Sequence, residues 1–148
     1  MATRRIFLTG TAAGLAALAL PRVVRADAHL QLTGGREPRD ATALTAEERL
    51  HLPALAMPER VHPGRAFDLV VRVGVDVHPM DAAHHVDRVE VALDGALAWA
   101  VDLSPHVPFP VLRIPLLLAA DATRAQLDVR ARCTQHGVWL TRRALELA

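Results

Sequence analysis

The only cysteine of the 148-residue chain, Cys133, is followed three residues later by His136. Gly137 comes next and can adopt the backbone conformation that a tight turn requires. A thiolate and an imidazole at this spacing can bind one metal ion together. An inert buried thiol is the alternative, because a single cysteine cannot form an internal disulfide. The nearby histidine favours metal binding.

A second histidine-rich segment lies upstream, where His78 is followed by a proline and, after a short loop, by His84 and His85. The loop lets the side chains of His78 and His84 turn back toward one ion. His85 should point the other way, because successive side chains alternate in an extended chain. His51 is a further candidate ligand, and His62 is the alternative to it. These residues predict a mononuclear site with one sulfur and several imidazoles.

Alternating apolar residues indicate the strands that would position these side chains. An Asp-Gly pair predicts a hairpin turn, and the only expected helix is one turn over 45–50, capped by Thr45. Short strands separated by turn residues predict an all-β fold, an immunoglobulin-like antiparallel β-sandwich with the metal site in loops at one end. Cys133 continues the apolar face of its strand, so its sulfur should be shielded from solvent. The predicted strands cover residues 67–75, 89–93, 111–118 and 127–133.

The first 28 residues have the features of an export signal. Arg4 and Arg5 form a twin-arginine pattern, which precedes an apolar run over 10–20 and an Ala-x-Ala cleavage site at 26–28. The apolar run is shorter than the roughly 20 residues that a membrane-spanning helix needs, so we expect no stable membrane insertion. We expect a mature protein that begins near His29 and works in the periplasm.

The chain divides into a signal peptide over 1–28, a flexible leader over 29–47 and one folded domain over 48–148. The leader is expected to be flexible because it is polar and punctuated by Gly and Pro. Removal of residues 1–28 takes away four arginines and one aspartate, which changes the formal charge from +1 to −2. The basic balance of the whole chain therefore comes from the signal, and a nucleic-acid-binding function is excluded.

Three motifs resemble the superoxide reductase family, which comprises neelaredoxin and the iron-binding domain of desulfoferrodoxin. That family carries His-x-Pro, then His-Pro-x4-His-His, then Cys-x-x-His-Gly-x-Trp. The chain has these motifs in the same order and spacing at 51–53, 78–85 and 133–139, and the resemblance covers roughly residues 48–142. It implies a mononuclear iron (Fe2+/Fe3+) with four imidazoles in a plane and an axial thiolate. The implied ligands are His51, His78, His84, His136 and Cys133.

The resemblance implies one-electron reduction of superoxide to hydrogen peroxide at the position left open on the ferrous ion. It also implies a separate electron-donor protein, and it is compatible with a homo-oligomer. Family members commonly place Glu-Lys directly before the first histidine, where the lysine attracts superoxide and the glutamate caps the oxidised iron. Here Glu48, Arg49 and Leu50 precede the histidine, and the chain has no lysine. We therefore name Glu48 and Arg49 as catalytic candidates, although an arginine is a poor proton donor.

Other classes of function fit parts of the sequence. A cupredoxin-like electron carrier usually needs a methionine soon after its second histidine, and no methionine follows Met80. A non-catalytic periplasmic metal-binding or carrier protein stays open as the alternative. A structural zinc site would leave one of five candidate ligands unused. We expect His29, His85 and His106 to be surface or supporting residues and Trp139 to pack over the site.

Overall fold

The computed structural model describes residues 31–148, so the predicted export signal lies outside the described residues. The described part of the chain contains one short helix and nine strands, and none of its helices is long and apolar enough to cross a membrane. The elements are α1 (Ala46–His51), β1 (Pro53–Ala56), β2 (Arg60–Val61), β3 (Ala66–Val73), β4 (Val86–Leu93), β5 (Ala96–Asp102), β6 (Val111–Leu117), β7 (Gln126–Cys133), β8 (Gly137–Ala144) and β9 (Glu146–Leu147).

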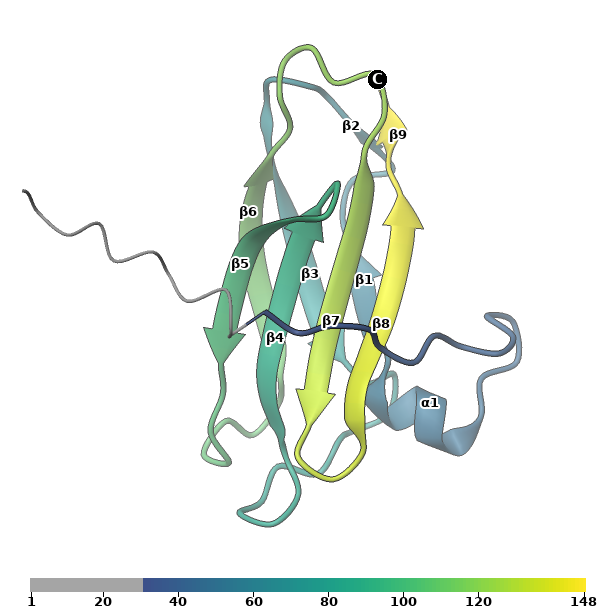
Figure 1. Cartoon of the computed structure of the whole chain (residues 1–148), viewed down its shortest axis with the longest axis vertical. Helices are drawn as coiled ribbons and strands as arrows, with labels where there is room; N and C mark the ends of the chain where they lie inside the picture. Colours follow the sequence, from purple (N-terminus) through teal and green to yellow (C-terminus); the bar gives the residue numbers. More distant parts are fainter. Residues whose placement is uncertain (1–30) are drawn as a thin grey trace, which may run out of the picture.

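The strands form two antiparallel sheets that pack face to face (Figure 1). One sheet has the order β1-β3-β6 and the other has the order β5-β4-β7-β8. The chain enters the first sheet, crosses to the second with β4, returns with β6 and ends in the second, which is the pattern of immunoglobulin-like domains. A short parallel pair of β2 and β9 lies at one end of the sandwich. The predicted all-β sandwich is confirmed.

The core is formed by the inward-facing residues of the predicted strands. Leu69 and Val71 in β3 and Leu127 and Val129 in β7 are fully buried. Burial of each such side chain contributes about 1.5–3 kcal/mol before conformational entropy is subtracted. The predicted strand over 67–75 ends two residues early, at Val73, because the next residue is a glycine with φ of +85° that turns the chain.

The predicted turn and helix are both present. Asp94 and Gly95 have φ of 48° and 81° and join β4 to β5. Helix α1 follows Thr45, whose hydroxyl accepts the N–H of Glu48 while the Glu48 carboxylate accepts the N–H of Thr45. This capping box stabilises a helix of only six residues. The helix ends at His51, which brings the first candidate ligand to one end of the sandwich.

Residues 31–40 form an N-terminal strap that crosses the outer face of the four-stranded sheet (Figure 1). Leu32 is buried, and its N–H donates to the Glu90 carboxylate at 2.7 Å. Arg36 is hydrogen-bonded through its backbone to β8, with distances of 2.9 and 2.8 Å. The flexible leader predicted over 29–47 is described from residue 31 onward, where the strap makes these bonds to the sheet. The reason is that β8 is an edge strand whose free backbone groups pair with the strap.

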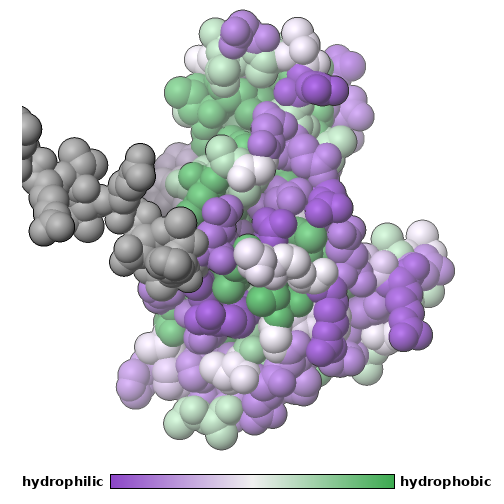
Figure 2. Space-filling view, viewed as in Figure 1, coloured by the Kyte–Doolittle hydropathy of each residue, from purple (hydrophilic) through white to green (hydrophobic). Residues whose placement is uncertain are grey.

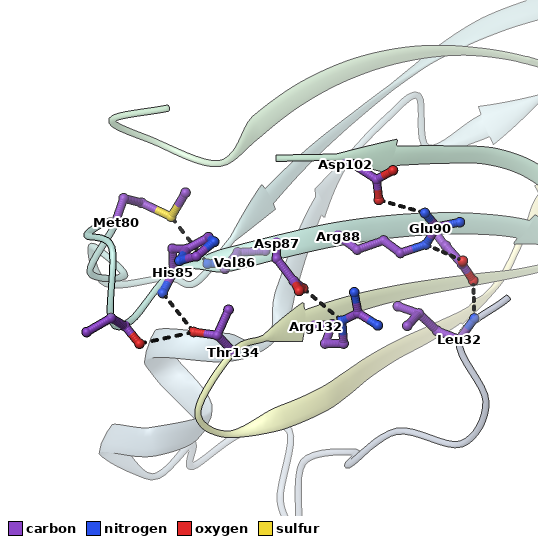
Figure 3. A network of polar contacts seen from close by, with 11 residues as sticks. Leu32, Met80, His85, Val86, Asp87, Arg88, Glu90, Asp102, Arg132 and Thr134 are labelled. Atoms are coloured by element: carbon purple, nitrogen blue, oxygen red, sulfur yellow. Dashed lines mark hydrogen bonds and ion pairs between the residues drawn. The ribbon is translucent and has the colours of Figure 1, made fainter. Parts of the chain in front are cut away.

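The strap also explains two buried charges in β4. Arg88 and Glu90 alternate with the core residues of this strand, yet they are only 6% and 2% exposed. The Arg88 guanidinium donates to Glu90 at 2.7 Å and to Asp102 at 2.6 Å (Figure 3). The polar face of β4 is therefore buried beneath the strap, and its charges are paired as burial requires.

Apolar side chains are exposed on the side of the sandwich formed by β5 and β6. Hydrophobic surface is visible there in Figure 2, and Leu97, Trp99, Val111 and Leu117 are exposed. The Trp99 indole N–H donates to the carbonyl oxygen of Pro115 at 3.1 Å. This bond connects the open edges of the two sheets.

Candidate metal centre

Five predicted ligands come from four separate segments that meet at one end of the sandwich (Figure 1). The first is the last residue of α1, two lie in the loop between β3 and β4, the fourth ends β7 and the fifth lies in the β7–β8 turn. The ligand atoms of His51, His84, Cys133 and His136 all lie within 4.8 Å of one another. His78 joins this group through its ring contacts with His51 and His84.

The four imidazole rings stand at the corners of a square. Centroids of neighbouring rings are 4.7 Å apart for His51–His78 and His51–His136, and 4.8 Å apart for His78–His84 and His84–His136. The rings of His51 and His84, at opposite corners, are 6.1 Å apart. Neighbouring rings are inclined by 61–80° to each other. The four rings therefore enclose a common space between them.

The distances between the inner atoms fit a shared metal ion. His136 Nδ1 lies 3.1 Å from His51 Nε2, 3.2 Å from His84 Nε2 and 3.5 Å from Cys133 Sγ. Two nitrogens that bind one ion at right angles with bonds of about 2.1 Å lie about 3 Å apart. A single proton on Nδ1 could serve only one of these three neighbours. A cation bound to all of them explains the contacts better than hydrogen bonding does.

Backbone carbonyls set the tautomers of the two most buried rings. The Nδ1–H of His51 donates to the carbonyl oxygen of Glu47 at 2.7 Å, and that of His78 donates to the carbonyl oxygen of Pro79. Each ring therefore keeps the lone pair of Nε2 for a ligand. His78 Nε2 is buried without a hydrogen-bond partner among residues 31–148. An unsatisfied buried nitrogen is costly, and a metal ion would satisfy it.

Burial keeps these rings neutral, as metal binding requires. It lowers the pKa of His51 and lowers that of His78 to about 4. Cys133 is also buried, which confirms that its sulfur is shielded. His84 and His136 are only half-buried. One side of the square is therefore enclosed by protein and the other side reaches solvent.

The β7–β8 turn and the β3–β4 loop are tied to each other. Cys133 pairs with Gly137, whose φ of +74° closes a three-residue hairpin turn. The Thr134 N–H donates to the carbonyl oxygen of His85 at 3.0 Å, and the His85 N–H donates to the Thr134 hydroxyl at 3.2 Å (Figure 3). These bonds bring His84 beside His136.

The start of the β3–β4 loop is tied to the end of α1 in the same way. The N–H groups of Val75 and Asp76 donate to the carbonyl oxygen of Arg49 at 2.7 and 3.0 Å. Gly74 has φ of +85°, and a Cβ there would lie 2.5 Å from the carbonyl oxygen of Leu50. Only glycine permits so close an approach. This contact places His51 and His78 side by side.

Glu48 and Arg49, the two catalytic candidates, both make contacts that stabilise the local structure. The Glu48 carboxylate accepts the N–H of Thr45 at 2.7 Å with one oxygen and the N–H of Arg39 at 3.0 Å with the other. These bonds lower the pKa of Glu48 and commit its carboxylate to the helix cap. The Arg49 guanidinium makes two bonds of 2.8 Å to Asp76, which raise the pKa of the arginine and lower that of the aspartate. The charge of Arg49 is thus paired at the surface.

Of the remaining histidine predictions, the one for His29 lies outside the described residues, and His106 is exposed as expected. His62 is exposed and follows β2, at the other end of the sandwich. Neither His78 nor His85 is in the group of four converging donor atoms, but of these two described residues only His78 has ring contacts with His51 and His84. Trp139 is buried and stacks on His51, with ring centroids 5.0 Å apart and planes inclined by 14°. Its predicted role of packing over the site is confirmed.

Sequence reasoning missed Arg36, whose guanidinium lies 5.0 Å from the centroid of the Trp139 ring, on the strap. Its location in a segment predicted to be flexible concealed it. The signal that could have found it is the Gly-Gly pair directly before it. Gly35 has φ of +131°, and a Cβ there would lie 2.7 Å from the Leu140 Cβ. Such a pair permits close backbone approach to a sheet.

A family model described as Desulfoferrodoxin matches residues 43–142. A curated protein described as a "Desulfoferrodoxin homolog", from Methanothermobacter thermautotrophicus, is 35% identical over 69 residues. The match covers 47% of this chain and 50% of that protein, so the chain spans about half the length of its curated relative.

Solved structures of similar shape include proteins described as superoxide reductases. The neelaredoxin from Ignicoccus hospitalis has a TM-score of 0.65 at 24% identity, covering 77% of this chain and 95% of that one. A putative superoxide reductase from Thermotoga maritima has a TM-score of 0.62 at 18% identity, covering 77% and 94%. At these identities the matches show a shared fold.

Proposed function

The chain belongs to the desulfoferrodoxin family, and on that premise we propose that it is a mononuclear non-haem iron protein that reduces superoxide to hydrogen peroxide. The observation that carries this proposal is the square of four imidazoles with a thiolate beside it. The reductase-like fold of the solved structures is consistent with it.

The donor set suits iron. Imidazole binds Fe(II) well, and a thiolate adds electron density to the metal. Four donor atoms converge, from His51, His84, Cys133 and His136, and the unsatisfied Nε2 of His78 offers a fifth, which exceeds the four of a structural zinc site. We assign as ligands the Nε2 atoms of His51, His78 and His84, the Nδ1 of His136 and the Sγ of Cys133. The fit rests on the unsatisfied Nε2 of His78 and on the three short contacts of His136 Nδ1.

Iron bound there would supply one electron at a time to a small oxidant. The residues of this chain hold the site ready for that step. Cys133, buried beside the His136 ring, would bind the metal as a thiolate and favour electron release, and the neutral imidazoles of His51 and His78 require no proton loss before they bind metal. Superoxide takes up one electron and two protons to become hydrogen peroxide. A separate one-electron donor protein then restores the reduced state.

Access for the anion is proposed on the side of His84 and His136, because these two rings reach solvent. Little positive charge is available near the site to attract superoxide. Leu50 occupies the position of the family lysine, and the charge of Arg49 is shared with Asp76. We propose that capture of superoxide is slower than in relatives with a lysine at this position, while metal binding is unaffected.

The twin-arginine pattern at Arg4 and Arg5 supports a further part of the proposal, namely export to the periplasm after folding. Copper and zinc outcompete Fe(II) for sites of this kind. Folding in the cytoplasm before export would let iron bind first.

The test is the stoichiometry of superoxide consumption. Protein loaded anaerobically with Fe(II) is mixed with superoxide, and both hydrogen peroxide and oxygen are measured. We expect one hydrogen peroxide for each superoxide consumed, without oxygen release, because no superoxide is oxidised. The zinc-loaded protein is the control and should consume superoxide no faster than buffer alone, in which superoxide disproportionates spontaneously. Oxygen release in equal amount would indicate dismutation, and no consumption by the iron form would contradict the proposal.

A further inference from the structure

The N-terminal strap lies outside residues 43–142, which the family model matches. Its contacts nevertheless converge on the support of one proposed ligand. Arg36 is the strap residue that makes them, through its side chain to Trp139 and to Glu47. Both of these residues touch His51.

The first route runs through the Trp139 indole. The Arg36 guanidinium lies over the Trp139 ring, 5.0 Å from its centroid, and the His51 ring lies 5.0 Å from the same indole in a nearly parallel plane. A cation over an indole is attracted by the negative face of the ring. The indole therefore connects the strap to the imidazole.

The second route runs through α1. Arg36 Nη1 donates to the Glu47 carboxylate at 3.0 Å. The backbone carbonyl of Glu47 accepts the Nδ1–H of His51 at 2.7 Å. This carbonyl fixes both the tautomer and the tilt of the imidazole, as outer partners of metal-binding histidines do.

The position of Arg36 is itself fixed by the backbone. Its N–H and carbonyl pair with Val138 and Leu140 of β8, and Gly35 passes so close to Leu140 that no side chain fits. Upstream, the buried N–H of Leu32 anchors the strap to Glu90 (Figure 3). The guanidinium is therefore presented from a rigid base rather than from a free tail.

We propose that Arg36 is a positioning residue for the metal centre, which fixes the ring plane of His51 by clamping Trp139 against it and by holding Glu47 in place. The inference rests on the proposed function and extends the centre beyond the family-matched residues. The Arg36–Glu47 ion pair should contribute little to folding stability, because exposed ion pairs contribute roughly 0–1 kcal/mol. Its effect should appear at the metal.

The experiment compares two ion pairs of the same strap. Arg36–Glu47 and Glu37–Arg142 are both exposed, with side chains 57% and 50% accessible in the first and 48% and 45% in the second. Only the first reaches His51. The full chain and its Arg36→Ala and Arg142→Ala variants are loaded with Fe(II), and the rate of iron loss to a ferrous chelator and the visible spectrum of the oxidised form are recorded.

We expect Arg36→Ala to lose iron about tenfold faster, the lower end of the effect of outer partners, and to shift the visible band. Arg142→Ala should match the parent protein. Arg36→Lys should fall between them, because it keeps the charge but not the planar guanidinium. Trp139→Leu should also release iron faster, and adding Arg36→Ala to it should have a smaller effect than Arg36→Ala alone, because only the route through Glu47 is then left to lose.

Equal iron loss and equal spectra for Arg36→Ala and the parent protein would overturn the inference and leave the proposed function standing. Full additivity of the two substitutions would overturn it as well. If the parent protein binds no iron at all, the proposed function fails first. Thermal unfolding of the metal-free variants shows whether any difference in iron loss comes from a general loss of stability, which would also contradict a positioning role.

Discussion

At the scale of single residues, His78 and His85 form a matched pair within one loop. Each has a buried ring nitrogen without a hydrogen-bond partner among the described residues. Only His78 belongs to the square of imidazoles, where its Nε2 is left for a ligand. His78 is fully buried whereas His85 is half-buried, and the difference between them should be seen in metal binding.

We predict that His78→Ala weakens Fe(II) binding at least about tenfold, because a ligand is lost and losses of outer partners alone have that effect. His85→Ala is the control and should change it little. Competition with a chromophoric chelator measures both. Equal weakening by the two substitutions would contradict the assignment of His78 as a ligand.

Leu50 directly precedes His51, at the position where the resemblance to superoxide reductases implies a lysine. We predict that Leu50→Lys raises the rate constant for superoxide consumption by about tenfold at low ionic strength, since a cation near the site attracts the anion. The gain should shrink as salt is added. Stopped-flow kinetics measures it, with the neutral Leu50→Met as the control. A rate independent of this charge would show that the anion does not approach past α1.

At the scale of elements, α1 positions His51, and the residues of its capping box lie three positions apart in the sequence. Local chemistry of this kind is predictable from the sequence, as are the alternating strands and the Asp-Gly hairpin. The strap was not predictable, because its polar, Gly-rich composition is that of a mobile segment. Its order comes from pairing with the edge of β8, a contact between residues about 100 positions apart in the chain.

We predict that Thr45→Ala lowers the free energy of unfolding by about 1 kcal/mol, the usual cost of removing an N-cap hydroxyl. Iron loss should also accelerate, because fraying of α1 releases His51. Chemical denaturation and chelator assays measure the two effects. Thr42→Ala removes a hydroxyl bonded to Asp40 in an exposed turn and serves as the control. Equal effects of both substitutions would argue against a role for the cap.

At the scale of the whole molecule, the centre exists only when the sandwich is closed, because its donors come from the two ends of one loop, a helix and a hairpin turn. The sequence motifs identified the donors, since their types and spacing carry the chemistry. They could not show which ring faces which, because the square arises from the backbone ties between Thr134 and His85 and between Arg49 and Asp76. Nor could they show that Glu48 is committed to a cap.

Export is the prediction that concerns the complete chain. Replacing Arg4 and Arg5 by lysines keeps the charge but removes the twin-arginine pattern. We expect the precursor to accumulate in the cytoplasm with its signal attached, while replacement of Arg22 by lysine leaves export intact. Cell fractionation and the mass of the product measure this. Normal periplasmic accumulation of the double variant would contradict the assigned route.

The most direct test of the central claim is the visible spectrum of the oxidised protein together with its metal content. We predict one iron per chain and a thiolate-to-ferric charge-transfer band. In Cys133→Ser the band should disappear while the imidazoles still retain some iron, because only the sulfur donor is replaced. Stoichiometric zinc or copper without this band after anaerobic iron loading, or a band that survives in Cys133→Ser, would contradict the four-histidine, one-cysteine iron centre.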